Sequence, residues 1–156
     1  MKAVLQRVLS ASVSIDAQIV GEIGRGYLLL VGVEKGDDEA QVAGLVDKVL
    51  GLRLFANEQG KLDYDIRQVN GSVLVVSQFT LLADTQRGRR PSFTAAAAPD
   101  EAQCLYQEVV QRFAESVPVQ SGRFAADMQV RLVNDLSLIH ISEPTRRYAI
   151  SYAVFC

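Results

Sequence analysis

The densest run of polar side chains in the sequence directly follows an apolar segment. Residues 77–85 read SQFTLLADT, and they come after the strand-like SVLVV of residues 72–76. A strand end that presents Ser77, Gln78 and Thr80 suits a rigid site, because the strand fixes the backbone that carries these side chains. The same groups also cap turns, and their residue types alone slightly favour that simpler role.

A basic segment follows shortly afterwards. Residues 87–93 read RGRRPSF, in which Arg87, Arg89 and Arg90 precede Phe93. Guanidinium groups bind phosphates and an aromatic ring stacks on a nucleobase, so this composition is compatible with a nucleic-acid contact. A solvated basic loop is the more common meaning of such a cluster, and both interpretations stay open.

Acid–base chemistry near neutral pH has one conventional candidate. His140 is the only histidine, so a Ser-His-Asp triad, a histidine general base or a histidine-built metal site would depend on it. The two cysteines, Cys104 and Cys156, form neither a disulfide framework nor a metal-ligand spacing. Without His140, a reaction must use acid–base groups of the substrate or oriented backbone amides.

The apolar pattern predicts the elements that position these residues. Helices are expected over residues 37–55, with acidic residues in the first turn, and over residues 99–113, with a proline near the start. Extended segments are expected over residues 1–15, 19–23, 27–34, 72–79 and 128–133. This order predicts a single α+β domain with two main helices on a largely antiparallel sheet.

Length and composition exclude several classes of protein. The 156 residues suffice for one domain with a core, and 49% hydrophobic with 22% charged residues is typical of a globular protein. The net charge of −2 means that any nucleic-acid contact must come from a local basic patch. Residues 1–15 lack the apolar stretch of a signal peptide, and no apolar run is long enough to cross a bilayer. We therefore expect a cytoplasmic protein.

Several separate segments together resemble the D-aminoacyl-tRNA deacylase family. They read MKAVLQRVLSASVSI, GYLLLVGVEKGDD, SVLVVSQFTLLADT followed by RGRRPSF, and SGRFAADMQVRLVND, and the resemblance is collinear over residues 1–135. It implies a small α+β domain around a barrel-like antiparallel sheet, assembled as a homodimer. It also implies hydrolysis of the ester that joins a D-amino acid, or glycine mischarged on alanine tRNA, to the 3′-terminal ribose of tRNA. No metal or organic cofactor is implied.

The resemblance assigns roles to individual residues. The family's Ser-Gln-Phe-Thr motif falls on Ser77, Gln78, Phe79 and Thr80, which are expected to hold the terminal adenosine and the aminoacyl ester. Thr80 has been viewed in the family as a candidate nucleophile, but a lone threonine hydroxyl has no neighbouring base here to activate it. We prefer a ribose hydroxyl that helps to activate water, and backbone amides near Phe79 and Thr80 that stabilise the oxyanion.

Further residues are expected to bind the substrate. Arg7 matches the family arginine that braces the chirality-selecting loop. Phe124, Ala125 and Met128 are expected to line the pocket wall, with the simpler alternative that Phe124 and Met128 belong to the core.

The resemblance ends at residue 135. The family continues with Gly-Pro-Val-Thr and a final apolar strand, and its cis Gly-Pro, inserted into the partner subunit's pocket, excludes L-amino acids. This chain has Leu136 and Ser137 there, and residues 136–156 resemble the in-frame translation of a sequencing-library adapter. We therefore expect a deacylase-like domain over residues 1–135, incomplete at its C-terminus, and a non-native tail over residues 136–156 that carries His140. The alternative is a divergent last strand, because ISYAVF has strand-like composition.

Three functions compete at this point. The first is an editing esterase on aminoacyl-tRNA, which the intact segment 77–80 favours. The second is a non-catalytic tRNA-binding module on the same fold, which the missing Gly-Pro favours and in which the arginines of residues 87–90 make the contacts. The third is a small hydrolase of another ester, which nothing in the sequence supports.

Overall fold

The computed structural model describes residues 1–86 and 89–136. Arg87, His140 and the predicted tail after Leu136 lie outside the described residues. The elements, in chain order, are β1 (Lys2–Ile15), β2 (Gln18–Ile23), β3 (Gly26–Gly32), α1 (Glu39–Gly51), β4 (Phe55–Ala56), β5 (Leu62–Tyr64), β6 (Ser72–Ser77), the 3-10 helix η1 (Phe79–Leu82), α2 (Pro99–Ala114), β7 (Val119–Ser121) and β8 (Gln129–Asn134).

The first three strands form one long antiparallel hairpin. Asp16 and Ala17 connect β1 to β2 with φ angles of 50° and 63°, which is the positive-φ pair that a tight two-residue hairpin loop favours. β2 then pairs with the second half of β1, and β3 pairs with its first half. The remaining strands of the main sheet extend from this hairpin, because β6 pairs with β3 and β8 pairs with β1.

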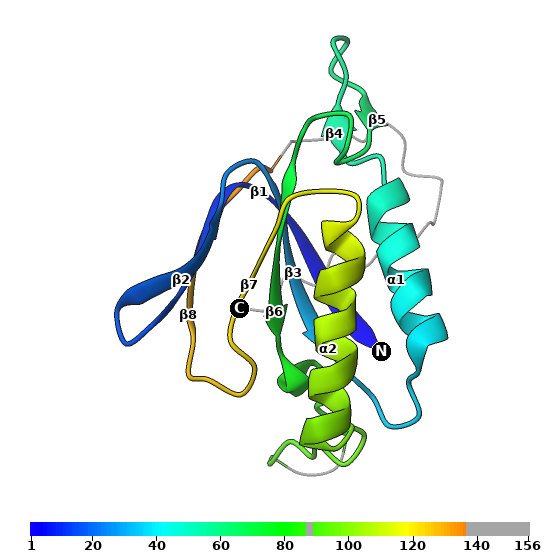
Figure 1. Cartoon of the computed structure of the whole chain (residues 1–156), viewed down its shortest axis with the longest axis vertical. Coiled ribbons are helices and arrows are strands. Elements are labelled where there is room, and N and C mark those ends of the chain that lie inside the picture. The colour runs from blue at the N-terminus through cyan, green and yellow to red at the C-terminus, as the bar shows by residue number, and fades with distance from the viewer. Residues whose placement is uncertain (87–88, 137–156) are drawn as a thin grey trace.

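The main sheet has the order β2-β1-β3-β6-β7, with β8 on the other side of β1. β6 pairs in parallel with both β3 and β7, and the other pairs are antiparallel. A Cβ atom on Gly21 of β2 would lie 3.1 Å from the carbonyl oxygen of Ser121 in β7, so the two ends of this order approach each other and the sheet nearly closes (Figure 1). The predicted α+β fold with a barrel-like, largely antiparallel sheet is confirmed, and the two parallel pairings are an addition to it.

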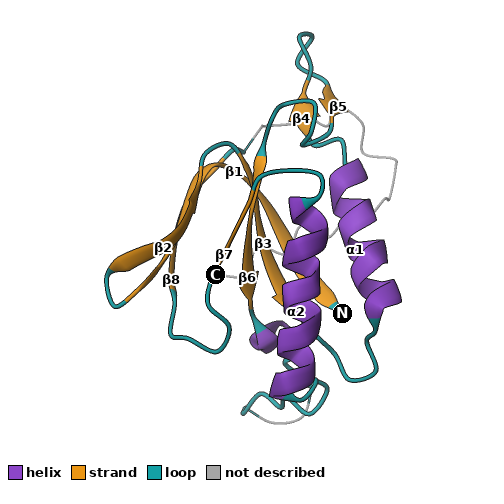
Figure 2. Cartoon of the chain, viewed as in Figure 1, coloured by secondary structure: helices purple, strands orange, loops and turns teal. Residues whose placement is uncertain are grey.

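Both helices lie on one side of the sheet, next to each other (Figure 2). Alternate residues of β6 belong to different layers: Val73 and Val75 pack in the cluster under the helices, whereas Leu74 and Val76 pack in a second cluster enclosed by β1, β2 and β8. This is the two-residue period of a strand whose two faces are both buried. The end of β6 is thus fixed from both sides.

Two predicted elements have different ends in the structure. The helix expected over residues 37–55 begins at Glu39, after the N-cap Asp38, and ends at Gly51, because Phe55 pairs with Tyr64 in the small β4–β5 sheet instead. The strand expected over residues 72–79 ends at Ser77, and Phe79 starts η1. None of the described helices is both long and apolar enough to cross a membrane.

Candidate active site

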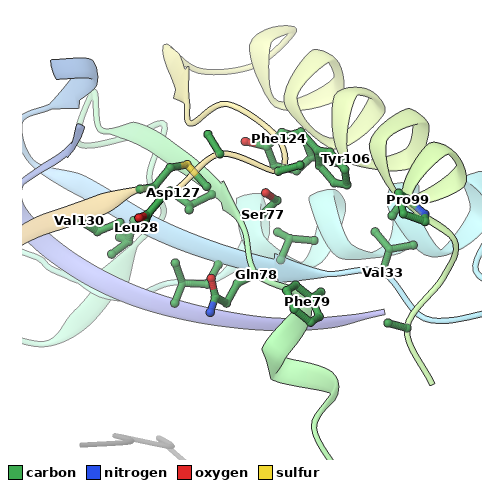
Figure 3. A pocket seen from close by; sticks show the side chains of 18 of the residues that line it. Leu28, Val33, Ser77, Gln78, Phe79, Pro99, Tyr106, Phe124, Asp127 and Val130 are labelled. Carbon is green, nitrogen blue, oxygen red and sulfur yellow. The ribbon is translucent and has the colours of Figure 1, made fainter. Parts of the chain in front are cut away.

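A cavity of about 820 Å³ opens beside the C-terminal end of β6. Strands β3 and β6 supply one wall, and α2 with the residues just before it supplies a second. The segment between β7 and β8 supplies a third, which brings residues far apart in the chain around Ser77 (Figure 3). The polar segment singled out in the sequence therefore lies at a concave site.

The backbone after β6 is held closely against β3. Ser77 lies opposite Val31 in the parallel pairing, and the Gln78 amide donates to the Val31 carbonyl at 2.7 Å, which carries the pairing one residue further. A Cβ atom on Gly32 would lie only 2.9 Å from the Gln78 carbonyl oxygen, so this close approach requires glycine. The chain then turns into η1, whose Leu82 is buried and anchors the turn.

The four residues of the motif do not all face the cavity. Ser77, Gln78 and Phe79 line it, whereas Thr80 is exposed and is not part of its lining. The Gln78 Nε2 atom donates to the Thr80 hydroxyl oxygen at 2.5 Å. Within the described residues, the backbone amides of Phe79 and Thr80 have no carbonyl acceptor, as is usual at the start of a helical turn. They are available as donors beside the cavity.

The three residues predicted for the pocket wall do lie along it. The cavity lining includes Phe124, Ala125 and Met128. Phe124 also packs against the core cluster under the helices, and Met128 packs against the second cluster. These two side chains therefore belong both to the cavity wall and to the edge of the core. Ala125 has a φ of 59°, a left-handed conformation that costs a residue with a side chain about 1–2 kcal/mol. Such strain is common at binding sites.

The cavity contains few groups that could exchange protons. Asp127 is the only charged side chain in its lining, and it is exposed. Tyr106 is buried and donates from its hydroxyl to the Val75 carbonyl at 2.9 Å. Burial raises the pKa of Tyr106 to about 12, although the Ser121 and Gly122 contacts act in the opposite direction. Tyr106 is therefore uncharged near neutral pH.

Sequence reasoning did not assign Tyr106 or Asp127 to the site. Tyr106 belongs to the apolar stripe of α2, which predicts only a core position, and its hydroxyl was the signal for a polar contact at the cavity. Asp127 adjoins Met128 in the chain, but nothing in its residue type distinguishes it from a solvated aspartate.

Of the predicted substrate-binding arginines, the three that the structure describes, Arg7, Arg89 and Arg90, lie outside the cavity. Arg7 donates from Nε to the Asp135 backbone carbonyl at 3.0 Å and forms an ion pair with the Asp135 carboxylate at 3.2 Å. Its Nη1 atom donates to the Leu54 carbonyl. Arg89 and Arg90 are exposed on the segment that follows η1. In the parts of the chain that are described, no group of His, Cys, Asp and Glu side chains is arranged to hold a metal ion.

Comparison with known proteins identifies the family. A family model described as D-Tyr-tRNA(Tyr) deacylase matches residues 4–141. The D-aminoacyl-tRNA deacylase of Salmonella enteritidis PT4 is 55% identical over 136 residues, which cover 86% of this chain and 94% of that protein. The protein of the same name from Pasteurella multocida is 54% identical with the same coverage.

Solved structures agree with this result. The c-Myc DNA unwinding element binding protein is 34% identical, with a TM-score of 0.82 over 86% of this chain and 93% of the other. A probable eukaryotic D-amino acid tRNA deacylase, at 15% identity and a TM-score of 0.72 over 85% and 93% of the two chains, shares the fold. Since the family model and relatives more than half identical span most of its length, this chain belongs to the D-Tyr-tRNA(Tyr) deacylase family.

Proposed function

We propose that this protein hydrolyses the ester bond of D-aminoacyl-tRNA and releases the free D-amino acid and the tRNA, as a proofreading step of translation. The observation that carries the proposal is the position of the family's Ser-Gln-Phe-Thr motif. Three of its residues line the cavity of about 820 Å³, in a chain 55% identical to a protein named D-aminoacyl-tRNA deacylase. A cavity of this size matches a ligand such as an aminoacylated adenosine.

The geometry favours a reaction in which the protein contributes oriented donors rather than a nucleophile. The Thr80 hydroxyl accepts a hydrogen bond from Gln78, and none of the described residues is paired with it as a base, so it is not activated. A ribose hydroxyl next to the ester helps a water molecule to attack the carbonyl carbon. The amides of Phe79 and Thr80 then stabilise the oxyanion until the ester bond breaks and the ribose oxygen takes up the proton.

The stereoselectivity proposed for this site involves a second subunit. The family resemblance implies a homodimer in which a cis Gly-Pro of the partner enters the pocket and leaves no room for an L-side chain. Arg7 is suited to support that segment, because it holds Asp135, the residue after which the Gly-Pro would follow. Leu136 stands in the place of the glycine, so the chain as printed lacks this selector.

We make three further proposals about the protein. Residues 1–135 form the deacylase-like domain and residues 136–156 are a non-native tail, which removes His140 and Cys156 from the chemistry. The enzyme acts in the cytoplasm, where aminoacyl-tRNA is used by the ribosome. It needs neither a metal nor an organic cofactor, because the substrate supplies the acid–base group.

A second candidate function rests on one specific observation. The sequence after Asp135 lacks Gly-Pro, so the printed polypeptide is alternatively a catalytically impaired tRNA-binding module that uses Arg87, Arg89 and Arg90. Binding of tRNA without any hydrolysis, even after the ending is restored, would support this alternative.

The proposal is tested with a chain whose residues from 136 onward are replaced by Gly-Pro-Val-Thr and an apolar strand. Release of D-tyrosine from D-tyrosyl-tRNA is measured with and without a chelator. We expect hydrolysis at the same rate in both, because no metal takes part. Loss of activity on chelation would contradict the metal-free mechanism, and absence of hydrolysis in both would contradict the proposed function.

A further inference from the structure

One aromatic side chain lies on the surface next to the cavity. Phe79 is 59% exposed, and it is the only exposed aromatic residue in the part of the chain that the structure describes. Burial of a phenylalanine side chain stabilises a fold, and this position forgoes that stabilisation. Phe79 is the first residue of η1, whose last residue, Leu82, is buried.

Phe79 is paired with a second ring from the basic segment. The ring centroids of Phe79 and Phe93 are 5.1 Å apart at an interplanar angle of 68°, an edge-to-face arrangement. Phe93 is held there by the residue before it, because the Ser92 amide donates to the Asp84 carbonyl at 2.9 Å and the Asp84 amide donates back at 2.8 Å. Phe79 lines the cavity (Figure 3), and Phe93 directly follows Ser92, so the ring pair connects the cavity to the loop closed by the pairing of Asp84 with Ser92.

This loop also carries unneutralised positive charge. Arg89 and Arg90 are exposed, and neither forms an ion pair with any other described residue. The Asp84 carboxylate at the base of the loop accepts a hydrogen bond from the Gln86 backbone amide at 2.9 Å. The chain as a whole has a net charge of −2, so these arginines form a local basic segment, which ends three residues before Phe93 in the chain.

We propose that Phe79 and Phe93 form a stacking platform for the nucleobase that precedes the terminal adenosine in the single-stranded CCA end of tRNA, with Arg89 and Arg90 at its phosphates. The inference rests on the proposed function. Once the ester occupies the cavity beside Ser77, the RNA strand must leave across the rim, where Phe79 stands. Stacking is independent of base identity, and arginines beside an aromatic ring are the usual partners of a single strand.

The occupant is RNA rather than a second copy of the chain on grounds of chemistry. The other large exposed apolar residues lie away from η1 in the fold: Leu9 and Val133 on the paired strands β1 and β8, Leu136 just after β8, Ile19 on β2 and Leu62 on β5. An aromatic pair in the same segment as two unpaired arginines fits a planar base and a phosphate. It fits the core of a protein–protein interface less well, because such cores are depleted in charged residues.

The first test measures binding of the trinucleotide CCA and of adenosine alone to the chain with a restored ending. Phe93→Leu should weaken trinucleotide binding about fivefold or more, whereas Phe93→Tyr, which keeps a ring, should restore it to within about twofold. Phe79→Leu, at an exposed position that does not threaten folding, should act in the same direction. Ile19→Ala removes an equally exposed apolar residue on β2 and should have no effect.

The second test separates this inference from the proposed function. Hydrolysis of D-tyrosyl-tRNA is compared with hydrolysis of D-tyrosyl-adenosine, which has no preceding nucleotide. The loss of kcat/KM in Phe93→Leu should be at least about fivefold larger on the tRNA. Equal losses on both substrates would overturn the platform, and absence of hydrolysis of both by the unmutated chain would overturn the function instead. If Phe93→Leu weakens self-association in sedimentation experiments and leaves trinucleotide binding unchanged, the occupant is a second copy and the inference is wrong.

Discussion

The segment of residues 77–80 and the loop of residues 84–92 are neighbours in the chain, but the protein holds them differently. The first continues the parallel pairing of β6 through the Gln78 amide and lies against Gly32 without space for a methyl group. The second is joined at its ends by the pairing of Asp84 with Ser92, and its described arginines project into solvent.

The difference between these segments indicates that one serves catalysis and the other serves binding. Reacting groups must be placed to within a fraction of an ångström, because small displacements cost large factors in rate. Charge–charge attraction falls slowly with distance, so a solvated loop is sufficient for binding phosphates. We expect residues 77–80 to control the rate of hydrolysis and the loop to control affinity. Three variants test these expectations.

The largest effect is expected from Gly32→Ala. The new methyl group would lie 2.9 Å from the Gln78 carbonyl and 3.3 Å from Leu82 Cγ, so the turn that carries Phe79 and Thr80 must move. A shift of about 1 Å is expected to lower kcat on D-tyrosyl-tRNA roughly 100-fold. The measurement is single-turnover deacylation together with thermal unfolding.

Gly24→Ala is the matched control for this substitution. A Cβ atom at Gly24 would meet nothing within 4 Å, and this glycine has no positive φ. Its activity should equal that of the unmutated chain. If Gly32→Ala keeps full activity while both variants fold, the close packing of the turn is not what positions the reacting groups.

A smaller effect, on affinity alone, is expected when Arg87, Arg89 and Arg90 are replaced together by alanine. KM should rise while kcat stays the same, and the slope of log KM against log salt should flatten by about 2, since each phosphate contact to a single strand contributes about 0.7. Arg53→Ala, at an exposed arginine beside Asp63, serves as the control for loss of positive charge. An unchanged salt slope would show that the loop is merely solvated.

The smallest effect is expected at the cavity wall, from Tyr106→Phe. The substitution removes one of two donors to the buried Val75 carbonyl, which keeps the Gly122 amide at 3.0 Å, and should lower the free energy of unfolding by about 0.5–1.5 kcal/mol. Burial raises the pKa of Tyr106 from 10.0 to about 12 in the folded protein. The uncharged tyrosine therefore contributes stability that is present below pH 10 and is lost as the pH rises toward 12.

Chemical denaturation between pH 8 and pH 11 tests this expectation. The unmutated protein should lose stability more steeply above pH 10 than Tyr106→Phe does, because only the former has this group to titrate. Parallel profiles for the two proteins would mean that Tyr106 is less buried than the structure indicates.

The elements were predictable where periodicity was long and regular. The apolar stripe of α2 and the alternation in β8 locate those elements well, and the resemblance indicated a barrel. The two parallel pairings of β6 were not predictable, since both depend on where a helix returns the chain to the sheet. The early end of β6 was missed because Gln78 and Phe79 continue a strand-like composition, whereas the packing of Gly32 and Leu82 turns the backbone.

The candidate site was predictable only where its residues form one contiguous motif in the sequence. Ser77, Gln78 and Phe79 were named from one contiguous motif, and the structure places them at the cavity. The outward position of Thr80 and the cavity position of Tyr106 depend on side-chain directions set by tertiary packing. The roles proposed for Arg7, Arg89 and Arg90 remain predictions, because a contact to RNA leaves no trace in the fold of the free chain.

Stereoselective deacylation is tested most directly by hydrolysis of matched D- and L-tyrosyl-tRNA by two proteins. One is the chain as printed, and the other carries Gly-Pro-Val-Thr and an apolar strand after Asp135. We expect the restored chain to cleave the D-substrate and to spare the L-substrate, and the printed chain to be slow or to cleave both. If the restored chain cleaves neither substrate, or cleaves both equally, the central claim is wrong. If the printed chain melts as high as the restored one and still rejects the L-substrate, the tail is a functional ending and its proposed non-native origin is contradicted.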